Sequence, residues 1–412
     1  MSAVLAPLRT PAFRRLVAGR GCAELANAIA PVALAFAVLD LTGSLVDLGL
    51  VVGARSAAVV VLVLFGGMLA DRLPRSVLLQ GTALVAAVTE AVTAAAVLGG
   101  FASVPLLVAL SVVNGMAAAV SLPAAAALTP QTVAPDLLAQ ANALARIGVN
   151  TGRFTGAAVG GLLVGVLGPG WAMVVDAAVF LAAVFAYRLV RVGRAPRPER
   201  AGVLRDLADG WREFTEHTWV WVVVLQFMVV NAVLAGALLV LGPAVADQTV
   251  GRTAWGFAIA AQTLGALVGG VLVAHWRPRR ALAVGVAAIL LEAVPLVVLA
   301  ELPLVVPLVA ALFLVGASTE VFVVAWDVSL QENVAEQKLA RVYSYDMLGS
   351  FIALPLGEVA AGPLATRFGV EPTLLAGAAV LVAATCLALC SREVRRLTRR
   401  DPTAAAAPGS PP

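Results

Sequence analysis

Long apolar runs alternate with short polar breaks along nearly the whole chain. Each run is close to the roughly 20 residues that a helix needs to cross the hydrocarbon core of a membrane, and none shows the two-residue alternation of a membrane β-strand. The pattern predicts six helices in the first half, at residues 17–39, 45–70, 77–98, 104–128, 143–167 and 171–190. It predicts six more in the second half, at residues 219–241, 253–274, 281–299, 303–330, 342–365 and 373–390. The expected fold class is an all-α membrane protein with twelve transmembrane helices.

The composition supports a location in lipid. Hydrophobic residues occupy 61% of the 412 positions and charged residues 13%, whereas charged residues make up about a quarter of an ordinary soluble chain. The first apolar run follows Arg9, Arg14 and Arg15 and so imitates a secretory signal, but it continues past Leu39 and further runs come after it. We therefore expect no cleaved leader.

Cysteine and histidine do not form a pattern that would bind a metal. Cys22, Cys386 and Cys390 all lie in apolar segments, where buried thiols are more often packing residues than ligands. The two histidines, His217 and His275, are expected near the cytoplasmic surface, which argues against metal chemistry inside the membrane. We expect no disulfide framework, no metal site and no cofactor.

One long polar stretch, residues 191–217, separates the two sets of helices. It is rich in arginine and begins with a proline-punctuated segment, and residues 204–211 have the spacing of a short helix lying on the membrane surface. The expected domains are a six-helix bundle at residues 1–190, a cytoplasmic linker at 191–217, a second six-helix bundle at 218–391 and a disordered cytoplasmic tail at 392–412.

The positive charges predict the orientation. Most of the 28 lysines and arginines lie on the side of the two termini, whereas the opposite side has only Arg252 and Arg367. Short loops rich in positive charge stay in the cytoplasm, so both termini should be cytoplasmic and the chain should cross the plasma or inner membrane many times. The sequence pI of about 9.4 then reflects arginines beside anionic lipid and not nucleic-acid binding.

The two halves repeat each other. The loop at residues 66–75 matches the loop at residues 269–279 with one residue inserted, and three glycines of the first half recur 201 positions later. These glycine pairs are Gly156 with Gly357, Gly161 with Gly362, and Gly168 with Gly369. The repeat indicates a duplication, with the substrate path between two pseudo-equivalent bundles.

The segment Gly67-x-Leu69-Ala70-Asp71-Arg72-x-Pro74-Arg75 resembles the loop motif of the major facilitator superfamily, which usually has Gly at the position of Pro74. The resemblance implies that Gly67 allows two helices to approach closely. It also implies that Asp71, Arg72 and Arg75 form a conformational latch. The alternative is a positively charged cytoplasmic loop with an acidic residue at a helix end.

A second segment, with Gly152, Gly156, Gly160 and Gly161, is similar to the antiporter motif of exporters in the same superfamily, although Ala157 replaces the usual proline. Residues 355–363 further resemble drug and siderophore exporters of the macrolide-efflux type. The resemblance implies export, and the alternative explanation of the glycines is simple close helix packing. Many proton-coupled antiporters have Arg at the position of Ser111, so proton coupling through that position cannot be carried over.

Ionisable side chains inside the helices are costly in hydrocarbon and normally face a water-filled path or one another. Eight polar residues are expected to form the substrate and coupling cavity: Arg20, Glu24, Asn27, Asn114, Arg153, Asn231, Glu320 and Asp327. A buried glutamate there could exchange its proton for substrate, because burial favours the neutral acid. The alternative is structural ion pairing of Glu24 with Arg20 or Arg153.

These observations predict a secondary transporter that exports a small amphipathic organic compound, such as a drug, a macrolide-like antibiotic or a siderophore, by proton antiport with alternating access. A nucleotide-binding loop is excluded in its usual form, because the single lysine, Lys338, follows Gln337. We expect a monomer that is not an enzyme and whose partners are its substrate, protons and the lipid bilayer. The open alternatives are a metabolite importer of the same fold and a membrane-embedded enzyme using Glu320 and Asp327.

Overall fold

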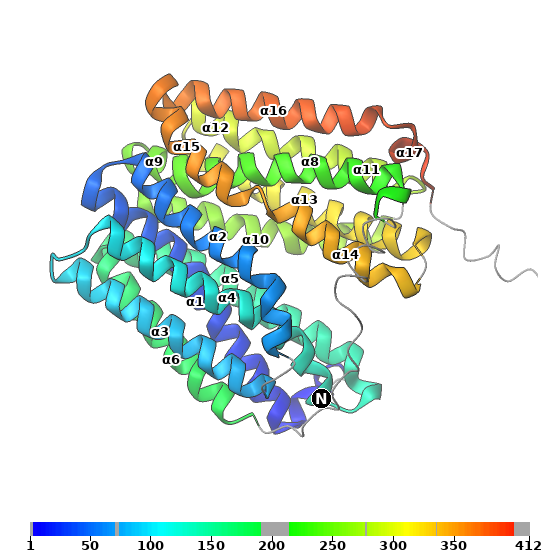
Figure 1. The fold of residues 1–412 in the computed structure, drawn as a ribbon, viewed down its shortest axis with the longest axis horizontal. Helices are drawn as coiled ribbons and strands as arrows, with labels where there is room; N and C mark the ends of the chain where they lie inside the picture. Colours follow the sequence, from blue (N-terminus) through cyan, green and yellow to red (C-terminus); the bar gives the residue numbers. More distant parts are fainter. Residues whose placement is uncertain (1–2, 71–73, 191–213, 277, 335, 399–412) are drawn as a thin grey trace, which may run out of the picture.

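A computed structural model describes residues 3–70, 74–190, 214–276, 278–334 and 336–398, and it contains helices and no strand in those ranges (Figure 1). After a short 3₁₀ turn at Ala3–Arg9, the first half consists of α1 (Pro11–Thr42), α2 (Leu45–Ala70), α3 (Arg75–Leu98), α4 (Val104–Leu128), α5 (Leu138–Leu167) and α6 (Pro169–Arg188). Two 3₁₀ turns, η2 (Thr129–Gln131) and η3 (Pro135–Leu137), connect α4 to α5. The six predicted helices of this half are all present.

The second half has the same number of membrane passages, but several are composite. The seventh passage combines α8 (Thr218–Ala235), the π-helical η4 (Gly236–Leu241) and α9 (Gly242–Gln248), and α10 (Arg252–His275) follows. The ninth combines α11 (Ala281–Ala288), the 3₁₀ segment η5 (Ile289–Ala293) and α12 (Val294–Glu301). The remaining helices are α13 (Val305–Asn333), α14 (Glu336–Phe351), α15 (Leu354–Phe368), α16 (Val370–Cys390) and the short α17 (Arg392–Arg396).

Two features differ from the sequence expectation. The eleventh helix is not continuous, because a turn at residues 352–353 separates α14 from α15. This break lies just before Pro355, which has no backbone N–H to continue the hydrogen-bond ladder of α14. In the described ranges, eleven helical stretches are long and apolar enough to cross a membrane. The remaining passage, α5, has polar side chains along one side but packs lengthwise between α1 and α10.

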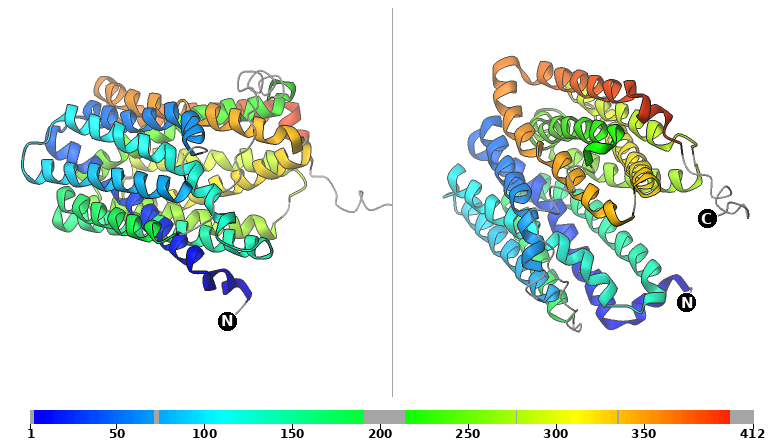
Figure 2. Two further views of the ribbon diagram at one scale, coloured as in Figure 1. Left: turned by 60° about the horizontal axis from the view of Figure 1, so that its bottom comes forward. Right: turned by 45° about the vertical axis from the view of Figure 1, so that its right-hand side comes forward.

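The helices form two bundles that meet along two helix pairs. In the first half α1 packs on α5 and α6, α3 packs on α6, and α2 packs on α4. In the second half α10 packs on α13, and α8 packs on α14, α15 and α16. The halves touch mainly where α5 meets α10 and where α2 meets α15, and the views in Figures 1 and 2 show the two bundles side by side. The predicted fold class, with two six-helix bundles, is confirmed.

The glycines of α5 let this helix approach two neighbours at once. A Cβ atom on Gly156 would collide with the backbone oxygen of Leu25 in α1. A Cβ atom on Gly161 would collide with Gly256 in α10, which belongs to the other half. One helix of the first bundle therefore makes a close contact within its own bundle and another across the interface.

The second half repeats this arrangement with the glycines displaced by 201 positions. A Cβ atom on Gly357 of α15 would collide with Ala232 of α8, within the same bundle. A Cβ atom on Gly362 would collide with Leu45 of α2, across the interface. The repeated glycines thus perform the same two packing tasks in both halves, as expected of a duplicated bundle.

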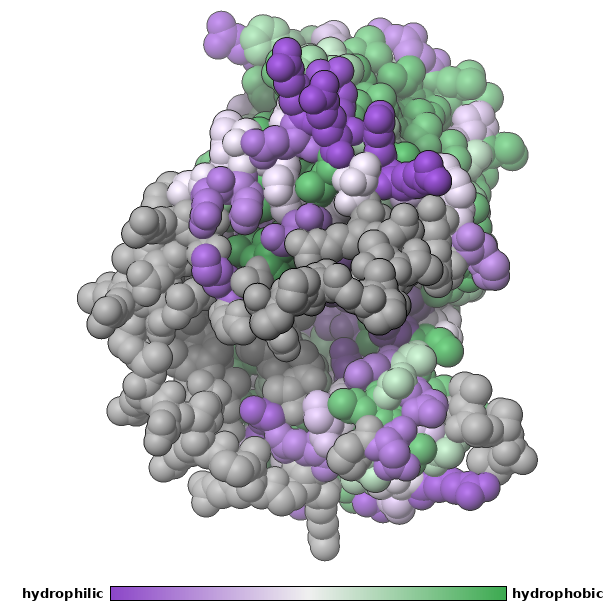
Figure 3. Space-filling model, turned by 90° about the vertical axis from the view of Figure 1, so that its right-hand side faces the viewer, coloured by the Kyte–Doolittle hydropathy of each residue, from purple (hydrophilic) through white to green (hydrophobic). Residues whose placement is uncertain are grey.

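The two ends of the molecule differ. At the end opposite the N-terminus, the close contacts of Gly161 and Gly362 hold the halves together. Toward the end that contains the N-terminus, the bundles diverge (Figure 1) and enclose a wide cavity of about 1510 Å³. Figure 3 looks at this second end and shows hydrophilic side chains gathered over the helix ends of the second half. The structure is closed at one end and open at the other.

Candidate functional site

A cavity of about 430 Å³ lies between the two halves, on the closed side of the wide cavity. Helices α1, α2, α4 and α5 supply one wall, and η4, α9 and α10 supply the other. Its larger apolar residues are Pro31, Leu238, Leu239, Pro243, Trp255 and Ile259. Its polar residues are Glu24, Asn27, Arg55, Ser121, Arg153 and Thr263. A mostly apolar pocket with a few convergent polar groups is typical of a site for a small organic molecule.

Glu24 and Arg153 form an ion pair in the wall of this cavity. The Nε atom of Arg153 donates a hydrogen bond to Oε2 of Glu24 at 2.7 Å. The two residues meet because Gly152 and Gly156 bring α5 against the backbone of α1 at this level. Of the two ion-pair partners considered for Glu24, the structure brings Arg153 to it, and Arg20 instead faces the wide cavity.

Arg55 of α2 is the second guanidinium of the cavity. Its Nε donates to Oδ1 of Asn114 at 3.0 Å, and its Nη2 donates to Oδ1 of Asn27 at 3.4 Å. Neither acceptor carries a charge, so the cavity wall contains a cation held by two amide oxygens. Asn114 itself is buried behind the wall and connects Arg55 to α3.

The connection to α3 runs through the amide nitrogen of Asn114. This Nδ2 donates to Thr89 Oγ1 and to Glu90 Oε1, both at 3.2 Å. Asp176 lies on α6, the helix that packs on α3, and is fully buried. Sequence reasoning missed Asp176, although an aspartate in the middle of the apolar segment 171–190 is itself a signal, because such residues rarely lack a role.

The wide cavity carries further polar residues of α5. Arg146, Asn150 and Arg153 all line it, as their common spacing along the helix predicts, and Arg20 lines it from α1. Glu320 of α13 lies on the opposite wall, and its Oε1 is 3.4 Å from Nη2 of Arg146. This ion pair joins the two halves across the open side of the molecule.

Two of the predicted cavity residues are held elsewhere. Asn231 of α8 donates a hydrogen bond to the backbone oxygen of Ser350 in α14 at 2.9 Å. Asp327 of α13 accepts one from the hydroxyl of Tyr343 at 2.9 Å. The structure does not bring these two side chains to Glu24 and Arg153, because their hydrogen bonds hold them within the second half.

Two residues of the predicted latch, Asp71 and Arg72, lie outside the described residues. Gly67 lies in the last turns of α2, and Arg75 is the first residue of α3. Both positions are at the open end of the first half. In the ranges that the structure describes, no cluster of three or more His, Cys, Asp or Glu residues could hold a metal ion.

Known proteins that resemble this chain include exporters. The multidrug efflux pump Tap of Mycolicibacterium fortuitum is 26% identical over 385 residues, which cover 90% of this chain and 92% of Tap. The enterobactin exporter EntS of Shigella dysenteriae is 29% identical over 264 residues, which cover 63% of this chain and 62% of EntS.

A solved structure supports the fold. A bacterial homologue of the human lysosomal transporter Spinster, in an inward-facing and occupied conformation, matches 96% of this chain with a TM-score of 0.74 and 17% identity. At that identity the likeness concerns the fold alone. Residues 2–408 match MFS_3, the family described as transmembrane secretion effectors. With that match over nearly its whole length, this multi-pass membrane protein belongs to the transmembrane secretion effector family of the major facilitator superfamily.

Proposed function

We propose that this chain exports a small amphipathic organic compound, such as a drug, a macrolide-like antibiotic or a siderophore, in exchange for protons. The observation that carries the proposal is the 430 Å³ cavity between the halves, whose apolar wall holds the Glu24–Arg153 ion pair and the guanidinium of Arg55. Such a wall suits a compound with a hydrophobic body and a charged or polar group. The similarity to Tap and EntS supports export as the direction.

Alternating access would move the compound across the membrane. In the conformation described here, the cavity communicates with the wide cavity through shared wall residues, Arg153 and Thr263. Closing the wide side and opening the side of Gly161 and Gly362 would expose the same cavity to the other face of the membrane. We propose that Asp71, Arg72 and Arg75 act as a latch on this movement and take no part in binding.

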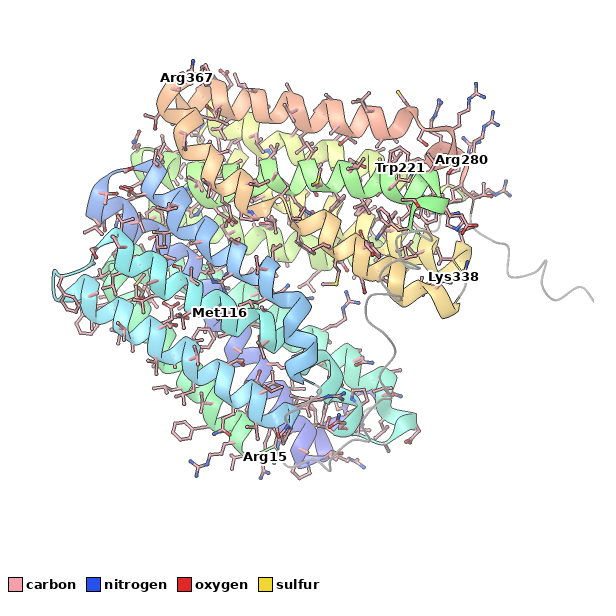
Figure 4. All side chains as sticks on the ribbon, in the orientation of Figure 1. Arg15, Met116, Trp221, Arg280, Lys338 and Arg367 are labelled. Carbon is pink, nitrogen blue, oxygen red and sulfur yellow. The ribbon has the colours of Figure 1, made fainter. Side chains whose placement is uncertain are left out.

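We further propose that the open end faces the cytoplasm of a cell membrane. Arg15, Arg280 and Lys338 lie at that end of the molecule, while Arg367 lies at the other (Figure 4). An excess of positive charge is typical of cytoplasmic loops. With this orientation the described conformation takes up its substrate from the cytoplasm, which is the first step of export. A reporter fused after Pro412 should therefore be cytoplasmic, and an external signal would contradict the orientation.

Both walls of the cavity come from one chain, so we propose that a monomer is sufficient for transport. We propose the same division of the chain as the sequence predicts, with bundles at residues 1–190 and 218–391, a linker at 191–217 and a tail at 392–412. Proteoliposomes reconstituted at one chain per vesicle should transport as fast per chain as densely loaded vesicles. A rate per chain that rises with loading would contradict the monomer.

The export proposal can be tested by measuring accumulation of antibiotics and siderophores in cells. Cells that contain the chain should accumulate less of at least one compound than cells that contain the Glu24→Gln variant. A protonophore should abolish the difference if protons drive transport. The matched control is Glu371→Gln, which removes an exposed carboxylate at the closed end. Higher accumulation with the wild-type chain would contradict export and favour an importer, and conversion of a compound without movement would favour an enzyme.

A further inference from the structure

Three charged side chains lie inside the first bundle, and one of them, Arg55, also lines the substrate cavity. They are Arg55 of α2, Glu90 of α3 and Asp176 of α6. Asp176 is 0% exposed and Glu90 is 9% exposed. Helices α3 and α6 pack side by side along the outer side of this bundle (Figures 1 and 2), and Asn114 of α4 links Glu90 of α3 to Arg55 of α2. The charges of Arg55, Glu90 and Asp176 act on one another.

The hydrogen bonds of the two carboxyl groups differ. Glu90 accepts a hydrogen bond from the amide of Asn114. Neither carboxyl oxygen of Asp176 has a hydrogen-bond partner among the described residues. A carboxylate in that situation has lost its water and received no donor in return, which is the costliest way to bury it. The neutral acid, which carries its own proton, suits the position of Asp176.

The charge balance of the three groups leads to the same conclusion. Arg55 contributes one positive charge, and the two carboxyl groups contribute two negative charges when both are ionised. A net charge inside a membrane bundle is unfavourable, so a single proton shared by Glu90 and Asp176 neutralises the cluster. The cluster is therefore neutral when its two carboxyl groups together hold one proton, which can be exchanged.

One other carboxyl group, that of Glu358 in α15, also acts on Arg55. It is buried at the interface with α2, accepts a hydrogen bond from Ser56 at 2.9 Å, and its Oε2 has no hydrogen-bond partner among the described residues. The neutral acid therefore suits Glu358 as well, and a neutral Glu358 leaves the balance of the three groups unchanged. On α1, Arg20 and Glu24 act on Tyr187 of α6. Tyr187 is eleven residues beyond Asp176, or about 16 Å along the helix.

The remaining neighbours supply no charge either. Helix α4 has no ionisable residue, and its Asn114 is the polar group that faces the cluster. On α5, Arg153 is already paired with Glu24. Among the described residues, Arg55 is thus the cation that faces both carboxyl groups.

Arg55 also connects the cluster to the substrate cavity. Its side chain lines the 430 Å³ cavity, and it lines a smaller cavity of about 70 Å³ together with Glu90, Ser111 and Asn114. A third cavity, of about 110 Å³, extends from Asn114 to Arg20 of the wide cavity. The cluster therefore borders the substrate cavity through Arg55, and its neighbour Asn114 lines a cavity that leads toward the open end.

We propose that Glu90 and Asp176 bind the proton that is exchanged for substrate, and that Arg55 couples this proton to a cationic amphipathic compound in the cavity. The proposal rests on the proposed proton antiport. When the proton leaves the carboxyl pair, the cluster carries a net negative charge, which favours binding of a cation in the cavity beside Arg55. When a proton returns, the cluster is neutral again and no longer attracts the cation. One proton and one monovalent cation thus exchange with no change in the total charge of the site.

The second half offers a matched control. Glu292 is 2% exposed and accepts a hydrogen bond from Thr319. In the internal repeat, Gly67 recurs 203 positions later as Gly270, and Gly156 recurs 201 positions later as Gly357. Glu292 lies 202 positions after Glu90, which is between these two offsets. Glu292 is therefore the pseudo-equivalent of Glu90, and its hydrogen-bond partner is the hydroxyl of Thr319.

The test uses the purified full chain and ethidium, a cationic amphipathic probe. Calorimetric titrations in two buffers of different ionisation enthalpy measure the protons released on binding. The wild-type chain and Glu292→Gln should each release about one proton per ethidium bound. Asp176→Asn should bind ethidium and release none. In proteoliposomes Asp176→Asn should keep ethidium counterflow and lose uptake driven by a pH gradient at least tenfold. Full proton release by Asp176→Asn would overturn the proposal.

A second measurement needs no substrate and separates this proposal from the proposed export. The infrared C=O band of a protonated carboxylic acid should be present in the ligand-free wild-type chain and should disappear as the pH rises. Asp176→Asn, or Glu90→Gln as a second variant, should weaken that band, whereas Glu292→Gln should leave its pH-dependent part in place. An unchanged pH-dependent band in both cluster variants would overturn the proton site. Failure of cells to export any compound would contradict the export function instead.

Discussion

Arg252, the first residue of α10, binds Asp40 near the end of α1 through two hydrogen bonds, from Nη1 to Oδ2 at 2.8 Å and from Nη2 to Oδ1 at 2.5 Å. Helix α1 belongs to the first half and α10 to the second, so this ion pair joins the halves at the closed end. Nε of Arg252 also donates to Asp247 at 2.7 Å, and the guanidinium lies 5.0 Å from the ring centre of Phe36. The pair stabilises the described conformation and must separate when this end opens.

Replacing Arg252 by glutamine should favour opening of the closed end. A two-pronged but partly exposed ion pair contributes about 1 kcal/mol, which corresponds to a shift of about fivefold in the ratio of closed to open molecules. Arg252→Lys should have an intermediate effect, because an ammonium group cannot form both hydrogen bonds in the same geometry. Spin labels at the exposed loop residues Phe101 and Leu304 would report the distance between the halves.

The matched control for this experiment is Arg367→Gln. Arg367 lies at the same end and stacks on the ring of Phe368. Its replacement changes the charge equally without removing an ion pair between the halves. If Arg252→Gln and Arg367→Gln gave the same distance distribution, the Arg252–Asp40 pair would have no part in keeping this end closed.

The glycine contact between the halves gives a second prediction. Gly161→Ala should lower the thermal unfolding midpoint, because the new methyl group would collide with the backbone of Gly256, and such overpacking costs about 1–3 kcal/mol. Gly81→Ala is the matched control, since a methyl group there meets nothing within 4 Å. That variant should be neutral or slightly stabilising, because alanine favours a helix over glycine by about 1 kcal/mol. Equal midpoints for the two variants would contradict the close contact.

The apolar runs were sufficient to predict the helices, because hydrophobic length is what membrane insertion requires. They could not predict where a passage changes its helix type. The π-helical segment Gly236–Leu241 begins at Gly236, which lies close to the backbone of Gly357 in another helix, and the local pattern does not record such a tertiary contact. The break before Pro355 did have a local signal, since proline has no backbone N–H to continue the hydrogen-bond ladder of the preceding helix.

The candidate site was predicted in part. The intervals of four and three residues between Arg146, Asn150 and Arg153 are those of one helical face, and the structure places all three on one cavity. Spacing alone cannot say which neighbouring helix a face will meet, so Arg153 as the partner of Glu24 and the separate position of Asn231 required the structure. A contact between distant helices leaves no mark in the periodicity of either one.

The small cavity behind Arg55 bears on the coupling mechanism. Sequence comparison left coupling open, because Ser111 stands where related antiporters have an arginine. In the structure, Ser111 and Arg55 line the same small cavity, so α2 supplies a guanidinium at a place where α4 has a hydroxyl group. The sequence of α4 alone does not reveal this guanidinium, because Arg55 belongs to another helix.

The Glu24–Arg153 pair gives a third prediction. Glu24→Gln should reduce export of ethidium at least tenfold, because the unpaired guanidinium adds positive charge to a cavity that must receive a cation. Exchanging the two residues, with Glu24→Arg and Arg153→Glu together, should restore part of the activity by restoring the pair. Retention of ethidium by cells, compared at equal protein levels, is the measurement. Undiminished export by Glu24→Gln would exclude Glu24 from the substrate site.

The Arg146–Glu320 pair gives a contrasting prediction. The side chain of Arg146 is 75% exposed and that of Glu320 is 25% exposed, with 3.4 Å between the charged atoms. Water and salt screen such a pair, so a double-mutant cycle with Arg146→Gln and Glu320→Gln should give a coupling energy of about 0.5 kcal/mol or less.

Because Glu320 is solvated in the wide cavity, Glu320→Gln should also leave the dependence of ethidium export on the pH gradient unchanged. The sequence places Glu320 among the predicted substrate and coupling residues, and the same experiment decides between Glu320 and the carboxyl pair of Glu90 and Asp176. If export by Glu320→Gln no longer responds to a protonophore, the coupling proton binds at Glu320 of α13 and not at the carboxyl pair of α3 and α6. If the sensitivity of export to the protonophore is unchanged and the coupling energy falls further at high salt, Glu320 is a residue of the wall of the wide cavity. Its pairing with Arg146 is then screened by water and salt.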